Sequence, residues 1–288
     1  MKFRVLICLL VFSVTVACIR EKDELTKQLH FCSSVCPYQD GLLIANWGSN
    51  TLDPLNSEGK GYIAFHKDGL TSILIPADGR LSAPKGMAVK DDFLFVADVN
   101  KLVVYNLRNS SETPQVIEFP EDNGWVNDVE IVGKVLFASV TNTGNIYALN
   151  ISNPSQIDTG SLAIYAVVPG AGALLISDYH LFIASSTVDG GPKEANVIYL
   201  IDDLSNPVVQ PITHRIGQYE GIAMAADGES LYFTDKYKCV LGKLIFSTGE
   251  IELVPTQMAL TNPTDIHWFQ GKLCVSDVTT STVWMLHL

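Results

Sequence analysis

GWVNDVEIVGKVLFASVTNTGNIYALNI, residues 124–151, carries the clearest signal of the fold in this chain. Polar and apolar residues alternate over 126–132, as in a half-buried strand, and Gly133-Lys134 then forms a two-residue turn. Residues 135–140 are a short apolar run, which is typical of a strand buried on both faces. A further turn and a second alternating segment complete the stretch at Ile151. We predict three antiparallel strands here, and such a unit needs neighbours to cover its faces.

The same pattern occurs six times along the chain. Each copy contains an apolar strand that ends at a small or polar residue, and these residues are Asn46, Asp98, Ser139, Ser185, Asp235 and Asp277. A second column lies upstream of the first and consists of Ser34, Gly86, Asp128, Gly172, Gly221 and Asp265. Repeats of roughly 40–50 residues with several strands each are typical of propeller blades. The sequence therefore predicts an all-β fold, a six-bladed β-propeller, with blades near residues 31–75, 83–118, 125–151, 171–212, 219–255 and 262–288.

Composition supports one globular domain. The chain has 288 residues, of which 47% are hydrophobic, and its formal net charge is −12. A chain of this size can bury a large core, and the repeat favours one closed ring over residues 31–288. The acidic balance argues against a nucleic-acid partner. We expect a monomer.

The N-terminus predicts export. Residues 1–17 combine a basic start with an apolar run that is too short to span a bilayer, as in a signal peptide. The run ending in Ala17-Cys18 resembles a bacterial lipobox, which implies a lipid on Cys18. An ordinary secretion signal cleaved nearby is the alternative. We expect residues 18–30 to form the lipid anchor and a tether, in a membrane-anchored lipoprotein of the periplasm, outer membrane or cell surface.

Four cysteines remain after the leader, namely Cys32, Cys36, Cys239 and Cys274. An exported compartment permits disulfides, and a ring places the first and last blades side by side. A bridge across the ring closure and buried free thiols are both compatible with the sequence.

Candidate ligand-binding residues lie where the innermost strand of each blade begins, because that point faces the mouth of the central channel. The pairs at this position are Ser33-Ser34, Lys85-Gly86, Asn127-Asp128, Ala171-Gly172, Glu220-Gly221 and Thr264-Asp265. Asn127, Asp128, Glu220 and Asp265 would bring oxygen atoms toward one axis, which suits calcium or a polyhydroxylated ligand. Alternatively, the two aspartates hydrogen-bond the next turn. Trp125 directly precedes this position and is a further candidate, and the long loops 47–60 and 187–195 should lie on the same face.

Three segments, residues 83–89, 94–98 and 126–129, resemble the senescence-marker-protein/gluconolactonase/luciferin-regenerating-enzyme family, with NHL-type repeats as near relatives. The resemblance implies a six-bladed, metal-dependent lactonase whose divalent cation is held by Glu, Asn and Asp side chains, with a further Asn at the pocket. Asn127 matches that further Asn, and Glu220 falls at the Asp position. Ser33 and Ala171 stand where the other two ligands are expected. We therefore assign a divalent cation, calcium or zinc, to Asn127 and Glu220 alone.

Two functions follow from these observations. The first is an exported, lipid-anchored propeller that binds a small molecule or a protein partner at its central channel face, with a degraded metal site. The second is a lactone or ester hydrolase that uses a rearranged divalent-metal site. If the chain is an enzyme, we expect a lactonase-like hydrolase; the sequence identifies no catalytic residue.

Overall fold

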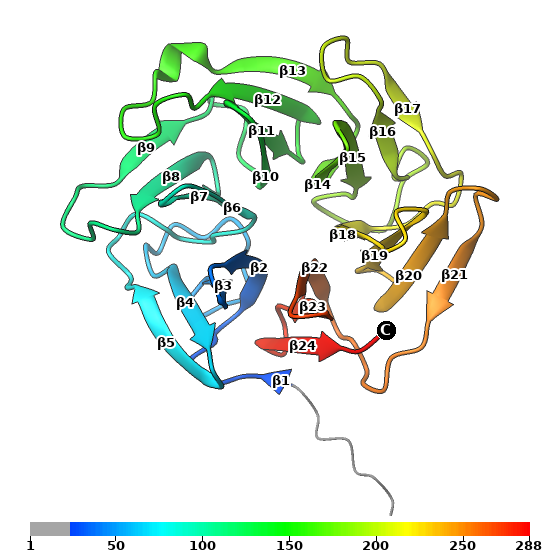
Figure 1. The fold of residues 1–288 in the computed structure, drawn as a ribbon, viewed down its shortest axis with the longest axis horizontal. Helices are drawn as coiled ribbons and strands as arrows, with labels where there is room; N and C mark the ends of the chain where they lie inside the picture. The colour runs from blue at the N-terminus through cyan, green and yellow to red at the C-terminus, as the bar shows by residue number, and fades with distance from the viewer. Residues whose placement is uncertain (1–23) are drawn as a thin grey trace, which may run out of the picture.

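The computed structural model describes residues 24–288, which form a closed ring of six four-stranded antiparallel sheets (Figure 1). This confirms the predicted all-β, six-bladed propeller. None of the residues in this range forms a helix that is long and apolar enough to cross a bilayer.

The strands follow one another outward from the central axis in each blade. Blade one contains β2 (Cys32–Tyr38), β3 (Gly41–Asn46), β4 (Tyr62–Lys67) and β5 (Leu70–Ile75). Blade two contains β6 (Met87–Lys90), β7 (Phe93–Asp98), β8 (Lys101–Asn106) and β9 (Gln115–Glu118). Blade three contains β10 (Val126–Val132), β11 (Val135–Val140), β12 (Asn145–Asn150) and β13 (Ala163–Val167). Blade four contains β14 (Ala171–Ser177), β15 (His180–Ser185), β16 (Tyr199–Ile201) and β17 (Val209–Pro211). Blade five contains β18 (Tyr219–Met224), β19 (Ser230–Asp235), β20 (Val240–Ile245) and β21 (Ile251–Val254). Blade six contains β22 (Pro263–Phe269), β23 (Lys272–Asp277), β24 (Thr282–Leu286) and, as its outer strand, β1 (Glu24–Leu25).

The N-terminal strand closes the ring. Glu24 pairs with Trp284 and Leu25 with Val283, so the first strand of the described residues completes the last blade. The prediction of a lipid anchor and tether over residues 18–30 is therefore wrong for Glu24 and Leu25, which form a strand of blade six. The predicted signal peptide and Cys18 lie outside the described residues.

Blade three is longer than predicted. A 3₁₀ turn, η1 (Thr159–Ser161), leads into β13, which pairs with β12 and completes a fourth strand beyond residue 151. Sequence analysis missed β13, because its side chains are mostly exposed and its outer edge is unpaired.

Hydrophobic clusters fill all six joints between neighbouring blades. The second strand of each blade supplies side chains to both of its joints, because alternate residues point to opposite faces. In β7, Leu94 and Val96 pack toward blade one, whereas Phe95 and Ala97 pack toward blade three. This two-sided burial explains why these strands read as continuous apolar runs.

Pairing register corrects one member of the first repeat column. Val140 pairs with Val126 in the way that Asn46 pairs with Cys32. Val140, and not Ser139, is therefore the counterpart of Asn46 in blade three. Ser139 lies one residue earlier, and its hydroxyl forms hydrogen bonds to two blades.

The Ser139 hydroxyl connects two blades close to the central axis. It accepts a hydrogen bond from Asp128 N at 3.1 Å in its own blade and donates one to Gly172 O of blade four at 2.6 Å. Thr234 makes the same pair of contacts from blade five to blade six, and Ser276 makes it from blade six to blade one. We call each such pair a hydroxyl relay. Each relay fixes the start of the innermost strand in the next blade.

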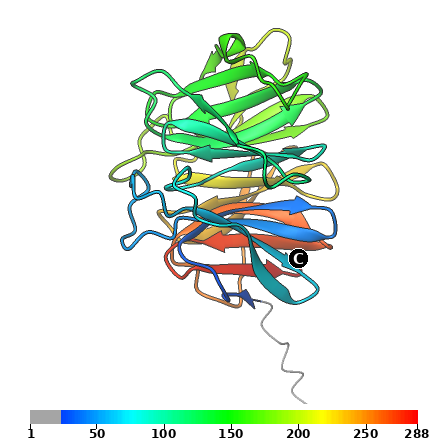
Figure 2. The ribbon, with the colours of Figure 1, turned by 90° about the vertical axis from the view of Figure 1, so that its left-hand side faces the viewer.

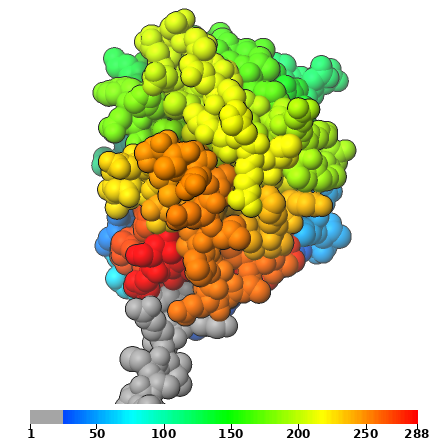
Figure 3. Space-filling model, turned by 90° about the vertical axis from the view of Figure 1, so that its right-hand side faces the viewer, coloured from blue at the N-terminus to red at the C-terminus, as the bar shows by residue number. Residues whose placement is uncertain are grey.

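One face of the ring carries the longest loops. Seen from the side, the β3–β4 loop and the β15–β16 loop project from the same face (Figure 2). A space-filling view of the side formed by blades four to six shows a closed surface with no opening toward the centre (Figure 3).

Candidate functional site

The first strand of five blades contains a β-bulge at the same end of the channel. In blade one, Cys32 pairs with Asn46 and Ser34 with Ala45, which leaves Ser33 as the extra residue. The residues at this position in the five blades are Ser33, Asn127, Gly172, Glu220 and Thr264. In blade two the same place is taken by Lys85, directly before Gly86, and both are hydrogen-bonded to Ala97 through their backbones. The bulges aim these residues at the channel mouth.

The assignment of Ala171 to the mouth is wrong by one residue. Ala171 pairs with Ser185 and is fully buried in the joint between blades three and four. Gly172 takes the mouth position instead, and Ala173 lines the cavity there. Neither residue offers a side-chain ligand, so the conclusion that this blade lacks a metal ligand is unchanged.

The mouth residues surround a cavity of about 300 Å³. Every predicted site residue lies in its wall, namely Trp125, Asn127, Asp128, Glu220 and Asp265. Both long loops contribute, the first through Leu52 and Pro54 and the second through Val188, which confirms that they share one face. The wall also contains Trp47, Lys85 and Lys236. The cavity is therefore part apolar and part charged.

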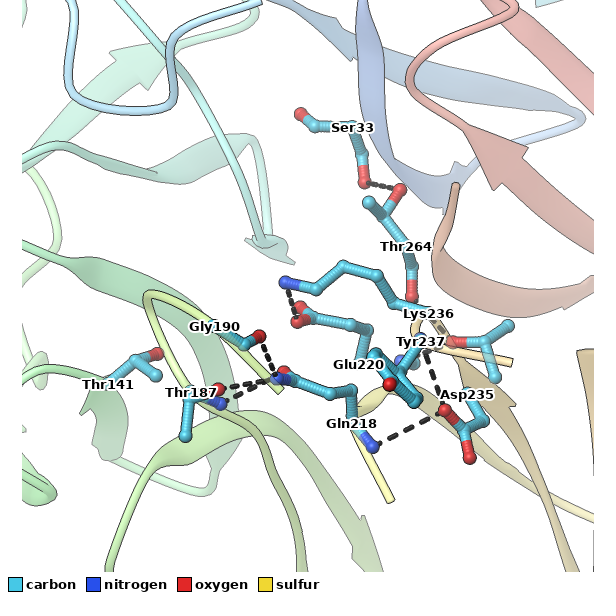
Figure 4. Close-up of polar contacts among 12 residues, drawn as sticks. Ser33, Thr141, Thr187, Gly190, Gln218, Glu220, Asp235, Lys236, Tyr237 and Thr264 are labelled. Carbon is cyan, nitrogen blue, oxygen red and sulfur yellow. Dashed lines mark hydrogen bonds and ion pairs between the residues drawn. The ribbon is translucent and has the colours of Figure 1, made fainter. Parts of the chain in front are cut away.

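Glu220 forms an ion pair that the sequence did not indicate. Its Oε1 lies 2.5 Å from Nζ of Lys236, which follows the end of β19 (Figure 4). Only 12% of the Glu220 side chain and 29% of the Lys236 side chain are exposed. The carboxylate at the mouth is thus already neutralised by an ammonium group of its own blade.

Lys85 is the second lysine in the wall. It is buried, and its Nζ donates hydrogen bonds to Pro54 O and Ala83 O, both at 3.1 Å. The same Nζ lies 5.6 Å from the centre of the Trp125 ring. Burial lowers the pKa of Lys85 to about 8. Sequence analysis placed Lys85 among the six pairs at the channel mouth, but nothing in its local sequence distinguished it from a surface lysine.

Asp128 and Asp265 accept hydrogen bonds from the following backbone, as the alternative to ligand binding predicts. They also form hydrogen bonds to neighbouring blades. Oδ1 of each accepts the backbone N–H of the following residue at 2.8 Å. Oδ2 of Asp128 accepts Leu174 N of blade four at 2.7 Å, and Oδ2 of Asp265 accepts the Ser34 hydroxyl of blade one at 2.6 Å. Burial, together with the nearby Asp265 carboxyl, raises the pKa of Asp128 well above its usual range, and burial raises the pKa of Asp265.

The donor set does not fit a divalent cation. Glu220 is paired with Lys236, and the Ser33 hydroxyl donates to Pro84 O at 2.5 Å. Residues 24–288 contain no cluster of three or more histidine, cysteine, aspartate or glutamate side chains placed to hold a metal ion. A hard cation needs several oxygen ligands at once, and here Glu220 already has a cationic partner while Asp128 and Asp265 accept hydrogen bonds from neighbouring blades.

The β15–β16 loop is tied to blade five beside this pocket. Gln218 accepts a hydrogen bond from Thr187 N at 3.0 Å and donates to Gly190 O at 3.1 Å, with a further contact to the Thr187 hydroxyl (Figure 4). These bonds place Val188 in the pocket wall.

All four cysteines of the described chain are free thiols. Cys32 and Cys274 do meet in the joint between blades six and one, as the ring closure suggested, but they pack there as small apolar side chains. No disulfide therefore links blade six to blade one among the described residues.

Comparison with known proteins supports the fold alone. No protein-family model and no curated protein matches the sequence. Similar solved structures include virginiamycin B lyase from Staphylococcus aureus, with a TM-score of 0.60 and 16% identity over 92% of this chain and 98% of that one. A putative oxidoreductase (glucose dehydrogenase) from Thermus thermophilus has a TM-score of 0.64 and 13% identity over 92% and 99% of the two chains. A protein of unknown function from Bacteroides thetaiotaomicron has a TM-score of 0.60 and 12% identity over 89% and 69%.

Proposed function

We propose that this chain is an exported, lipid-anchored β-propeller that binds a small amphipathic molecule in the pocket at the centre of the ring. One observation carries the proposal: side chains from all six blades converge on one cavity of about 300 Å³. Ligand sites are typically concave and largely apolar, with a few polar groups that fix orientation. Trp47 and Trp125 would contact the apolar part of the ligand, and the lysines and Glu220 would contact a polar head group.

The charge of the pocket favours an oxygen-bearing head group. Lys236 is balanced by Glu220, whereas Lys85 makes hydrogen bonds to carbonyl oxygens and no ion pair among the described residues. The carboxyls of Asp128 and Asp265 are held toward their neutral forms by burial. A carboxylate, hydroxyl or carbonyl group of the ligand would therefore meet amine donors. We favour a small-molecule ligand over a protein partner because a cavity of about 300 Å³ has the size of a small-molecule site, whereas a stable protein interface needs a much larger contact surface.

Saturation-transfer NMR with benzyl alcohol and phenylacetate tests this function on the full-length protein in detergent micelles. We expect signal transfer to both probes, and a loss of at least half of it in Trp125→Ala and Lys236→Met. Lys90→Met is the matched control, because Lys90 is a lysine outside the pocket that donates to Gly133 O. Equal transfer in the wild type and in both pocket variants would refute the proposal.

The cellular location is tested separately. The proposed lipid on Cys18 predicts that the protein sediments with membranes and incorporates labelled palmitate when it is produced in a bacterium. Cys18→Ser should lose the label and move to the soluble fraction. A wild-type protein that is soluble and unlabelled would support the alternative of an ordinary secretion signal.

The metal-dependent hydrolase that the family resemblance implies is the opposing hypothesis. No step of the proposed function uses a metal, because Glu220 is paired with Lys236. Calorimetric titration with calcium and zinc distinguishes the two. Micromolar binding that disappears in Glu220→Ala would favour the hydrolase.

A further inference from the structure

Lys85 is held rigidly at the pocket wall. Its backbone N–H donates to Ala97 O, and the next residue, Gly86, donates to Asn127 O of blade three, both at 2.8 Å. A Cβ on Gly86 would lie 1.9 Å from Oδ1 of Asp128, so no other residue fits there without a shift of this joint. The backbone of Lys85 is therefore fixed at the pocket wall, and its Nζ is fixed by the hydrogen bonds to Pro54 O and Ala83 O.

The hydrogen bonds of Lys85 suit a neutral amine. A neutral amine has two N–H donors and one lone pair, and the two carbonyl oxygens of Pro54 and Ala83 accept both hydrogens. The lone pair is then left for another partner. No carboxylate forms an ion pair with Nζ in the part of the chain that is described, in contrast to Lys236, whose ammonium is fixed by Glu220.

The protonation state agrees with this geometry. With a pKa of about 8, roughly a quarter of the Lys85 side chains are neutral at pH 7.5, against about one in a thousand for an ordinary lysine. Neutral lysines in apolar surroundings are the nucleophiles of imine chemistry. The Trp125 ring lies next to Nζ and offers an apolar surface to whatever binds there.

We propose that Lys85 forms a covalent imine with aldehyde or ketone ligands that place an apolar group against Trp125. This inference rests on the proposed function, because it names the ligand chemistry of the same pocket. The nitrogen lone pair attacks the carbonyl carbon, and the carbonyl oxygen takes up a proton to give a carbinolamine. The C–O bond then breaks, and the oxygen leaves as water with the two hydrogens that the nitrogen has lost. The step needs no oxidant or reductant and reverses by addition of water.

Reductive trapping tests the inference on the full-length protein in micelles. The protein is incubated with benzaldehyde and sodium cyanoborohydride, and the benzylated lysines are located by peptide mapping. We expect Lys85 to be labelled at least about tenfold faster than Lys236 and Lys90 at pH 7.5. Because cyanoborohydride reduces the protonated imine, the readout is the ratio of Lys85 labelling to Lys90 labelling at each pH, which should be greatest below pH 8 and fall toward pH 10, where ordinary lysines also lose their protons. Because the comparison is made within the wild-type protein, it does not depend on whether a Lys85 variant folds.

Benzyl alcohol separates this inference from the function on which it rests. It resembles the probe but cannot form an imine, so it should bind the pocket and slow labelling of Lys85. If benzyl alcohol binds while Lys85 is labelled no faster than Lys90, the imine is refuted and the binding function stands. If benzyl alcohol neither binds nor protects, the binding function fails, and preferential labelling of Lys85 alone would still support a reactive amine.

Discussion

Ser139→Ala removes one hydroxyl relay and should destabilise the ring measurably. Ser139 is fully buried, and its hydroxyl joins Asp128 N to Gly172 O. Ala45 and Ala97 occupy the corresponding positions of blades one and two, so alanine fits the packing. The substitution leaves a buried donor and a buried acceptor without their partner. Each such group costs about 1–3 kcal/mol, and we expect a total loss of about 2–4 kcal/mol.

Urea unfolding followed by circular dichroism measures this loss. In a thermal scan of a chain of this size, a loss of 1 kcal/mol lowers Tm by roughly 2–4 °C, so Tm should fall by about 4–16 °C. Ser139→Thr is the conservative control, because Thr234 makes the same pair of bonds in blade five. It should keep most of the stability. Ser110→Ala, an exposed site, should change the free energy of unfolding by less than about 0.5 kcal/mol. A Ser139→Ala variant as stable as Ser110→Ala would refute the relay.

Three further predictions concern the channel, the loop and the thiols. Burial raises the pKa of Glu130 to about 8 from 4.5, so the folded protein keeps a proton that the unfolded chain has lost, and stability falls as pH rises between these values. Glu130→Gln should therefore be about 1–3 kcal/mol more stable than the wild type at pH 9 and equal to it at pH 4; unfolding curves that show no gain at pH 9 would contradict this. Gln218→Ala should release the 187–195 loop and accelerate its cleavage in limited proteolysis, whereas an unchanged digestion pattern would show that the loop is held by other contacts. Iodoacetamide should label Cys239 before the other three cysteines of the described chain, because Cys239 alone is partly exposed, and peptide mapping that finds Cys274 first would overturn the packing of the closure.

The fold was predictable because its repeated strands have one-dimensional signatures. The second strand of each blade is buried on both faces, and its apolar run is visible in sequence regardless of its partners. The outer strand β13 was missed because an exposed edge strand has no such signature. Blade four was aligned one residue out because residues 171–173 are all small. Only the bulge in the pairing register shows that Gly172 is at the mouth.

The sequence predicted where the site lies in the fold, but it did not predict which side chains of the site contact one another. Trp125, Asn127 and Glu220 were placed correctly at the mouth, because bulged first strands repeat around the ring. The pairing of Glu220 with Lys236 depends on how two strand ends of one blade meet in space. The burial of Lys85 depends on the β3–β4 loop folding over it, since Pro54 O is one of its acceptors. Neither contact leaves a spacing that sequence analysis can detect.

The pairing of β1 with β24 also sets the order in which the molecule can be assembled. Blades one to five each consist of consecutive strands and can form as soon as those strands have left the ribosome. Blade six contains strands that are far apart in the sequence, because Glu24 of β1 pairs with Trp284 of β24. This pairing can form only after β24 has been synthesised. The loop closed by this contact contains nearly all of the described chain, and its entropic cost must be met before the contact forms. Until then the two end blades expose the apolar faces that later form their shared joint, so blade one stays open to non-native association until blade six has formed.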